Sequence, residues 1–139
     1  MLPYLKAWIL PDTKTAIIFT VILTIAICVG TLTPLPDKIY TPGSDKWHHF
    51  IAFAGLAYPL AAASRLYWIP ALIFALCLGA LIEIIQPYVN RFGDIKDFQA
   101  DALGVLFGIF IGTLAYQVKS RSVNSINVDP VKKKIREIG

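Results

Sequence analysis

The sequence predicts an all-α fold, an integral membrane bundle of four transmembrane helices in one domain. Hydrophobic residues make up 56% of the 139 positions, while charged residues make up 16%, well below the roughly 25% of soluble domains. The apolar residues also fall in long blocks instead of alternating with polar ones, which is typical of membrane spans. Short segments rich in proline, glycine or charge separate these blocks and predict turns.

The blocks predict spans at about residues 16–33, 47–64, 68–86 and 98–118. Residues 34–46 contain three prolines and a glycine, which predict a turn-rich loop between the first two spans. A tight turn at 65–67 and a polar loop at 88–96 make the other connections. The predicted organisation is a transmembrane domain at 1–118 followed by a basic cytoplasmic tail at 119–139.

The net charge of +4 does not indicate a nucleic-acid partner, because six of the thirteen basic residues lie in the last 21 positions and no basic stripe carries aromatic residues. Lys and Arg residues that flank spans favour the cytoplasmic side. With both termini inside, nine basic residues lie inside and four outside; without the six of the tail, the counts are three and four. The sequence therefore predicts cytoplasmic N- and C-termini, on the strength of the tail.

Under this topology, most acidic residues and both histidines, His48 and His49, gather at the outer face. Six of the nine acidic residues fall there, namely Asp37, Asp45, Glu83, Asp94, Asp97 and Asp101. A charge within a span costs roughly 2.5–3.5 kcal/mol on insertion scales, so it persists when it is paired, hydrated or needed. Because these residues come from three segments and reach one depth, they predict a shared polar site.

Helical spacing indicates how the site is assembled. Asp97 and Asp101 continue a stripe of glycines on the fourth span that contains two consecutive G-x-x-x-G steps, at Gly104, Gly108 and Gly112. Such glycines let helix backbones approach closely. We therefore expect the fourth helix at the centre of the bundle, with its acidic residues directed toward Glu83 and His49.

Each of these residues also has a simpler interpretation. Glu83 lies near a helix end and could extend its carboxylate into water. Asp97 could cap the fourth helix, and His49 could be an interfacial residue without a task. Arg91 could be solvated, neutralise Glu83 or bind an anionic headgroup. A metal is not expected, since no tight spacing such as H-x-x-x-H is present, and no cofactor is predicted.

Two segments resemble the motifs of the VanZ-like membrane proteins. The first, DKWHHFIAFAGLAYPL at 45–60, is similar to the family's D-K-x-x-H-F-x-x-F motif. The second, IEIIQPYVNRFGDIKDFQADALGVLFG at 82–108, resembles E-x-x-Q, an arginine and then D-x-x-x-N-x-x-G-x-x-x-G. The matched positions are Asp45, Lys46, His49, Phe50, Phe53, Glu83, Gln86, Arg91, Asp97, Gly104 and Gly108.

The resemblance implies a multi-pass protein of the bacterial cytoplasmic membrane. The founding member is associated with low-level resistance to the glycopeptide teicoplanin, and no established reaction goes with the family. This chain has Asp101 where the family usually has Asn. The added negative charge beside Asp97 requires protonation of one carboxyl, a cation or Arg91 as compensation.

The leading functional hypothesis is a protein that binds or modulates an envelope lipid or cell-wall precursor at the outer face, with membrane lipids as its partners. The expected binding residues are Asp45, Lys46, His49, Glu83, Gln86, Arg91, Asp97 and Asp101. One alternative is an interfacial acid/base enzyme acting on a phosphate- or sugar-bearing lipid, with His49, Glu83 and Asp97 as candidate catalytic residues. Another is a structural subunit whose polar cluster only fastens the helices. The sequence does not fix the oligomeric state.

Overall fold

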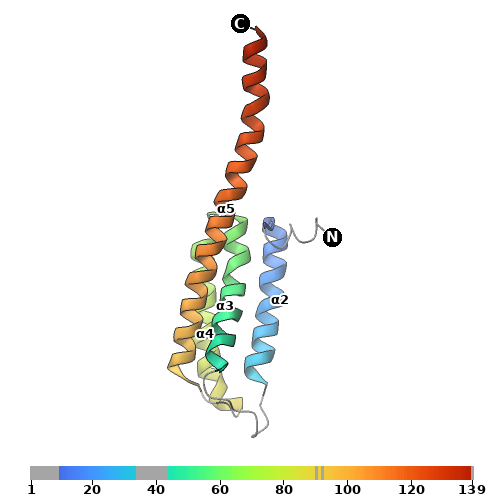
Figure 1. The fold of residues 1–139 in the computed structure, drawn as a ribbon. Coiled ribbons are helices and arrows are strands. Elements are labelled where there is room, and N and C mark those ends of the chain that lie inside the picture. The colour runs from blue at the N-terminus through green and yellow to red at the C-terminus, as the bar shows by residue number, and fades with distance from the viewer. Residues whose placement is uncertain (1–9, 34–43, 90, 92, 139) are drawn as a thin grey trace.

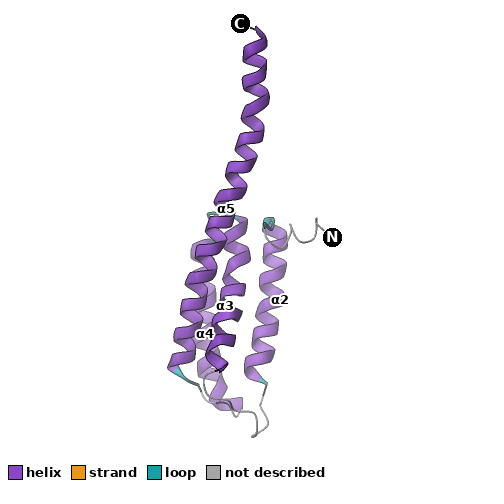
Figure 2. Cartoon of the chain, viewed as in Figure 1, coloured by secondary structure: helices purple, strands orange, loops and turns teal. Residues whose placement is uncertain are grey.

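The computed structural model describes residues 10–33, 44–89, 91 and 93–138, without the side chains of 44, 45 and 122–138. Its elements are α2 (Thr13–Leu32), α3 (Ser44–Ala63), α4 (Trp68–Ile85), the short 3₁₀ helix η1 (Gln86–Val89) and α5 (Ile95–Ile138). Every regular element in this part of the chain is a helix (Figure 2), so the all-α prediction is confirmed. Most of the predicted loop at 34–46 lies outside the described residues.

Among the described residues, three helical segments are long and apolar enough to cross a membrane: Thr13–Leu32, Trp68–Val89 and Ile95–Arg121. Their outward side chains are large and apolar, as Ile18, Ile84 and Phe110 illustrate with exposed fractions of 57%, 64% and 59%. Such surfaces are expected where lipid replaces water. The remaining helix, α3, has the same 20-residue length as α2. Its first two turns contain Lys46 and two histidines, which make it less apolar than those three segments.

The helices alternate in direction and form a bundle in which α3 contacts α2, α4 and α5 (Figure 1). Its core contains Phe53, Leu56, Ile82 and Val105, which are almost completely buried. The central helix is thus α3. The glycine stripe predicts the fourth span in that position, but the stripe packs against α3. Since α3 carries Phe53, Leu56 and the histidines of the predicted site, its position brings polar groups into a largely apolar bundle.

The two helices with the most extensive contact, α3 and α5, run in the same direction, and the glycine stripe lies between them. A methyl group added to Gly104 would overlap the carbonyl oxygen of Phe50, and one added to Gly108 would overlap that of Ala54. At Gly112 the added atom would lie 2.7 Å from the Tyr58 carbonyl oxygen. Both helices therefore advance by four residues per contact, and only glycine permits this backbone separation.

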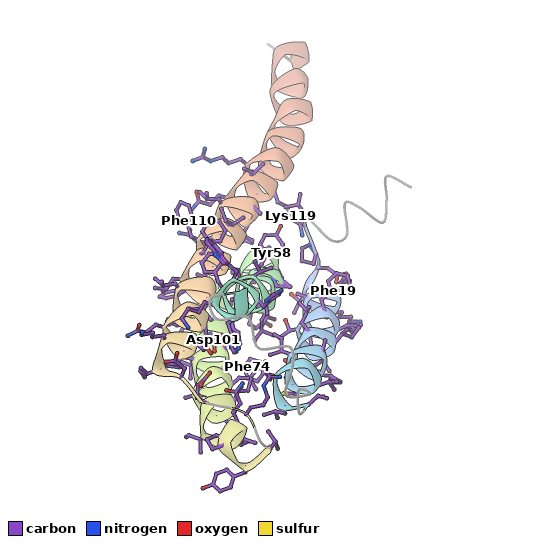
Figure 3. The ribbon with its side chains drawn as sticks, turned by 60° about the horizontal axis from the view of Figure 1, so that its bottom comes forward. Phe19, Tyr58, Phe74, Asp101, Phe110 and Lys119 are labelled. Carbon is purple, nitrogen blue, oxygen red and sulfur yellow. The ribbon has the colours of Figure 1, made fainter. Side chains whose placement is uncertain are left out.

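The start of the first helix, α2, is held by a local N-cap and by a hydrogen bond from α5. The Thr15 backbone N–H donates to Asp12 Oδ1 at 2.7 Å, forming an N-cap, and this bond lowers the pKa of Asp12. Lys119 of α5 donates to the Pro11 carbonyl oxygen at 3.1 Å. The start of α2 and residue 119 thus lie at one end of the bundle (Figure 3).

The helix that contains the fourth predicted span, 98–118, is α5, and it continues beyond that span. Its apolar part ends near Arg121, but α5 continues through the tail to Ile138 and projects beyond the other helices (Figure 1). No glycine or proline occurs between Thr113 and Asp129, so nothing in that stretch interrupts the backbone hydrogen bonds. The change from apolar to polar composition therefore marks the end of the span, not of the helix.

Candidate functional site

Three helix ends meet at the end of the bundle opposite Lys119. They are the start of α3, the end of α4 and the start of α5 (Figure 1). These ends carry the polar residues of both sequence motifs, because alternating helix directions bring them to one level. Asp45 belongs to the first turn of α3, and its side chain lies outside the described residues.

A buried pair, His49 and Asp101, joins α3 to α5. His49 Nδ1 lies 2.9 Å from Asp101 Oδ1, and the side chains are 2% and 0% exposed. Figure 3 shows Asp101 within the bundle. The other carboxylate oxygen, Oδ2, has no hydrogen-bond partner among the described residues and lies on the side of Gly79, where an added methyl group would approach it to 2.9 Å. Glycine on α4 therefore makes room for this acid.

The ammonium group of Lys46 makes a second connection between α3 and the start of α5. It lies 3.1 Å from Asp97 Oδ1 and 3.4 Å from Asp94 Oδ2. Asp94 also caps α5, since its Oδ1 accepts from the Lys96 N–H at 2.9 Å. That bond, followed by Lys46, holds the pKa of Asp94 below its ordinary value. The capping role considered for Asp97 thus belongs to Asp94, and Asp97 lies in the first turn.

Glu83 completes the cluster from α4. Its Oε2 accepts a hydrogen bond from the Asp94 backbone N–H at 2.8 Å, while Oε1 is buried without a hydrogen-bond partner among the described residues. One ligand-type atom each of His49, Glu83 and Asp97 lies within 4.8 Å of the others. The structure therefore brings together the three residues on which the predicted site depends, from three helices. Glu83 faces the bundle as well as the loop, so it is not simply extended into water.

The side chains of Gln86 and Arg91 donate hydrogen bonds to carbonyl oxygens at the end of α2. Gln86 Nε2 donates to the Thr31 carbonyl oxygen at 3.3 Å. Arg91 Nη1 donates to the carbonyl oxygens of Gly30 at 3.0 Å and Thr33 at 3.2 Å. The last carbonyls of a helix lack intrahelical partners, and cationic side chains satisfy them well. The sequence suggests water, Glu83 or an anionic headgroup as the partner of Arg91, and no pattern in it indicates these backbone carbonyls.

A cavity of about 460 Å³ lies beside the polar cluster, between α2 and α3. Its walls are mainly apolar and come from Leu23, Ala26, Ile27, Gly30, Thr31, Ala52 and Phe53, with His48, His49 and Arg91 also lining it. The three basic side chains lie toward the polar end of the bundle, while Leu23 and Phe53 lie deeper. The cavity is thus amphipathic along its length. His48 is exposed but contributes to this lining.

These features define a class of protein, a multi-helix membrane protein with a polar site at one end of the bundle. A family model described as VanZ/LLP1 matches residues 13–116, three-quarters of the chain, which therefore belongs to the VanZ/LLP1 family. Comparison with curated proteins and with solved structures gives no match. The match covers the four helices and ends just before the polar extension of α5.

Proposed function

We propose that this VanZ-like membrane protein binds or modulates an anionic envelope lipid or lipid-linked cell-wall precursor at the outer face of the bacterial cytoplasmic membrane. The observation that carries the proposal is the cavity between α2 and α3, which has apolar walls and basic side chains at one end. A lipid with a phosphate headgroup matches this arrangement, because its hydrocarbon chain suits the apolar walls and its phosphate suits the basic end. The volume is within the range of about 300–1,000 Å³ typical of ligand pockets.

The basic groups at the polar end suit a phosphate. Arg91 presents a planar fork of donors, and it lies in the short segment between η1 and α5, next to the ends of three helices. Its hydrogen bonds to the carbonyl oxygens of Gly30 and Thr33 hold the guanidinium group beside the end of α2. Lys46 adds a second cation near the same end, although Asp94 and Asp97 share it.

The orientation is part of the same proposal. The Lys and Arg counts favour the cytoplasmic side for residue 119 and the rest of the α5 extension. The Lys119–Pro11 hydrogen bond keeps the start of α2 at that same end of the bundle. The polar cluster is at the other end of the bundle and would then face outward, where lipid-linked precursors are used. Cytoplasmic N- and C-termini follow.

The test is lipid binding to the chain in nanodiscs of neutral phospholipid. We expect a polyprenyl phosphate to bind and the matching uncharged polyprenol to bind at least about tenfold more weakly. Arg91→Ala should lose that preference and Arg91→Lys should keep most of it. Arg65→Ala is the matched control, because Arg65 is an exposed arginine in the turn between α3 and α4, at the opposite end.

Equal affinity for the phosphate and the alcohol would contradict the proposal, as would equal effects of Arg91→Ala and Arg65→Ala. A second variant tests the cavity itself. Ala52→Phe adds bulk to its wall and should weaken binding of both lipids without changing the preference for the phosphate.

The buried pair of His49 and Asp101 favours a second candidate, an acid/base enzyme acting on such a lipid. A carboxylate on one ring nitrogen orients a histidine for proton transfer through the other, and Glu83 lies close enough to take part. Lipid extracts from cells that lack the protein should then accumulate the substrate, and His49→Ala should reproduce this. Unchanged lipid composition in both strains would exclude the enzymatic role.

A further inference from the structure

We propose that His49, Glu83 and Asp97 bind a divalent transition-metal ion, with Zn²⁺ as the first candidate. The three residues offer one imidazole nitrogen and two carboxylate oxygens from α3, α4 and α5, with all three atoms within 4.8 Å of one another. Atoms bonded to one zinc at about 2.0–2.2 Å lie roughly 3.3–3.6 Å apart. Small side-chain rotations therefore suffice to close the set around an ion.

Unpartnered buried oxygens around this cluster provide a separate argument. Glu83 Oε1 and Asp101 Oδ2 are buried and have no hydrogen-bond partner among the described residues, and Asp101 is fully buried as a whole residue. Asp101 contacts His49 through its first oxygen, and its second lies against Gly79, one helical turn from Glu83. Buried acceptors without a donor are costly, and a cation at the cluster would reduce that cost for both.

Asp101 holds His49 in the way that a carboxylate commonly holds a metal-bound histidine. Because Asp101 occupies the side of Nδ1, a bond to a metal would be made through Nε2. Metal-bound histidines usually present their second ring nitrogen to a carboxylate, which fixes the tautomer and the ring orientation. Asp101 is therefore a positioning residue in this proposal.

Charge balance agrees with a divalent ion. The cluster contains three carboxylates, those of Glu83, Asp97 and Asp101, and one ammonium group, that of Lys46, which lies 3.1 Å from Asp97. The other partner of Lys46, Asp94, is left out of this count because its side chain is 40% exposed and in contact with solvent. Two negative charges remain, which one divalent cation balances. Protonation of a carboxyl group is the alternative means of compensation, and it predicts no metal in the purified protein.

The donor set narrows the choice of ion. Imidazole suits Zn²⁺ and related ions, whereas Mg²⁺ and Ca²⁺ prefer oxygen ligands throughout. Three protein ligands also leave a coordination position unfilled, as in sites where zinc binds an exchangeable group. The inference does not rest on the lipid proposal, and its test uses the metal alone.

The experiment measures Zn²⁺ bound to the full chain, purified in detergent with an affinity tag that contains no histidine. After desalting, elemental analysis should find one zinc ion per chain. Co²⁺ in its place should give visible d–d absorption. His49→Ala, Glu83→Gln and Asp97→Asn should each weaken binding at least about tenfold.

Two matched controls separate the site from general surface charge. His48→Ala removes the neighbouring, exposed histidine, and Asp94→Asn removes the other acidic partner of Lys46 while keeping a residue that caps helices well. Both should bind zinc as the unaltered chain does. If His48→Ala and His49→Ala weaken binding equally, the proposal is wrong.

The melting temperature with and without Zn²⁺ tests the site even where a variant is too unstable for the binding measurement. Zn²⁺ should raise the melting temperature of the unaltered chain, and a chelator should reverse the rise. Asp94→Asn should show the same rise and Asp97→Asn should not. The absence of a rise in the unaltered chain, or zinc retention no greater than that of a Glu83→Gln/Asp97→Asn double variant, would overturn the metal site.

Discussion

The contact between α3 and α5 has two halves that differ in chemistry. In the half near residue 119, Gly104, Gly108 and Gly112 lie against the α3 backbone. In the other half, the contact is a histidine and a lysine against two aspartates. The comparison shows how a membrane bundle can contain buried charge: close backbone packing fixes the distance between the helices, and that distance brings the charged groups within bonding range.

The largest effect should come from breaking the buried pair in the polar half. His49→Ala leaves Asp101 buried without its partner, and breaking a buried pair in this way costs about 3–5 kcal/mol of unfolding free energy. The double variant His49→Ala/Asp101→Asn should recover part of the loss, because the second change removes the uncompensated charge. Unfolding in mixed detergent micelles measures both.

His48→Ala is the control for that comparison, since His48 is exposed and should cost little. A double variant no more stable than His49→Ala would contradict the electrostatic explanation and indicate lost packing instead. If all these variants fold normally while lipid binding in nanodiscs is lost, a purely structural role for the polar cluster is excluded.

The next largest effect should come from the glycine half. Gly108→Ala places a methyl group on the Ala54 carbonyl oxygen of α3, so the helices must separate at a cost of about 2–3 kcal/mol. Gly55→Ala is the matched control on α3, because nothing lies within 4 Å of the added carbon and alanine favours a helix. The same unfolding assay should show a loss for the first variant and no loss for the second.

Gly108→Ala also tests whether the two halves are coupled. If packing sets the distance between the charged groups, this substitution should weaken zinc binding although Gly108 touches none of the proposed ligands. Normal zinc affinity in a destabilised Gly108→Ala chain would show that the polar half is assembled independently.

The smallest effect concerns the solvent-exposed edge of the polar half. The Lys96 N–H and Lys46 lower the pKa of Asp94 below its ordinary value of 3.8. A carboxylate with a lowered pKa contributes stability above that ordinary value and loses it as the pH falls through its value in the folded chain. The melting temperature of the unaltered chain should therefore fall below pH 3.8 more steeply than that of Asp94→Asn. Parallel curves would contradict a contribution from Asp94.

Much of the fold could be predicted because span length and apolar composition are local properties. The spans beginning near Ala16 and Trp68 were predicted to within a few residues of the helices. The end of α5 could not be predicted in this way, because composition reports where lipid ends and not where backbone hydrogen bonding ends.

The site was predictable in outline for a different reason. Ionisable residues within membrane spans almost always face the bundle interior, so His49, Glu83 and Asp97, which share one depth, could be grouped from topology. Their individual partners could not be assigned. Arg91 bonds to α2 carbonyls, and no sequence pattern marks a backbone acceptor. A metal set drawn from three helices likewise has no fixed spacing along the chain.

The hydrogen bonds described above that secure α2 are made at its two extremities. Lys119 donates to the carbonyl oxygen of Pro11, and at the opposite extremity Gln86 and Arg91 donate to Thr31, Gly30 and Thr33. The cavity borders the stretch from Leu23 to Thr31, where the facing side chains of α2 and α3 are mostly apolar. A hydrocarbon chain that enters laterally from the bilayer would replace dispersion contacts between α2 and α3 with dispersion contacts of its own. The hydrogen bonds at both ends of α2 would remain intact.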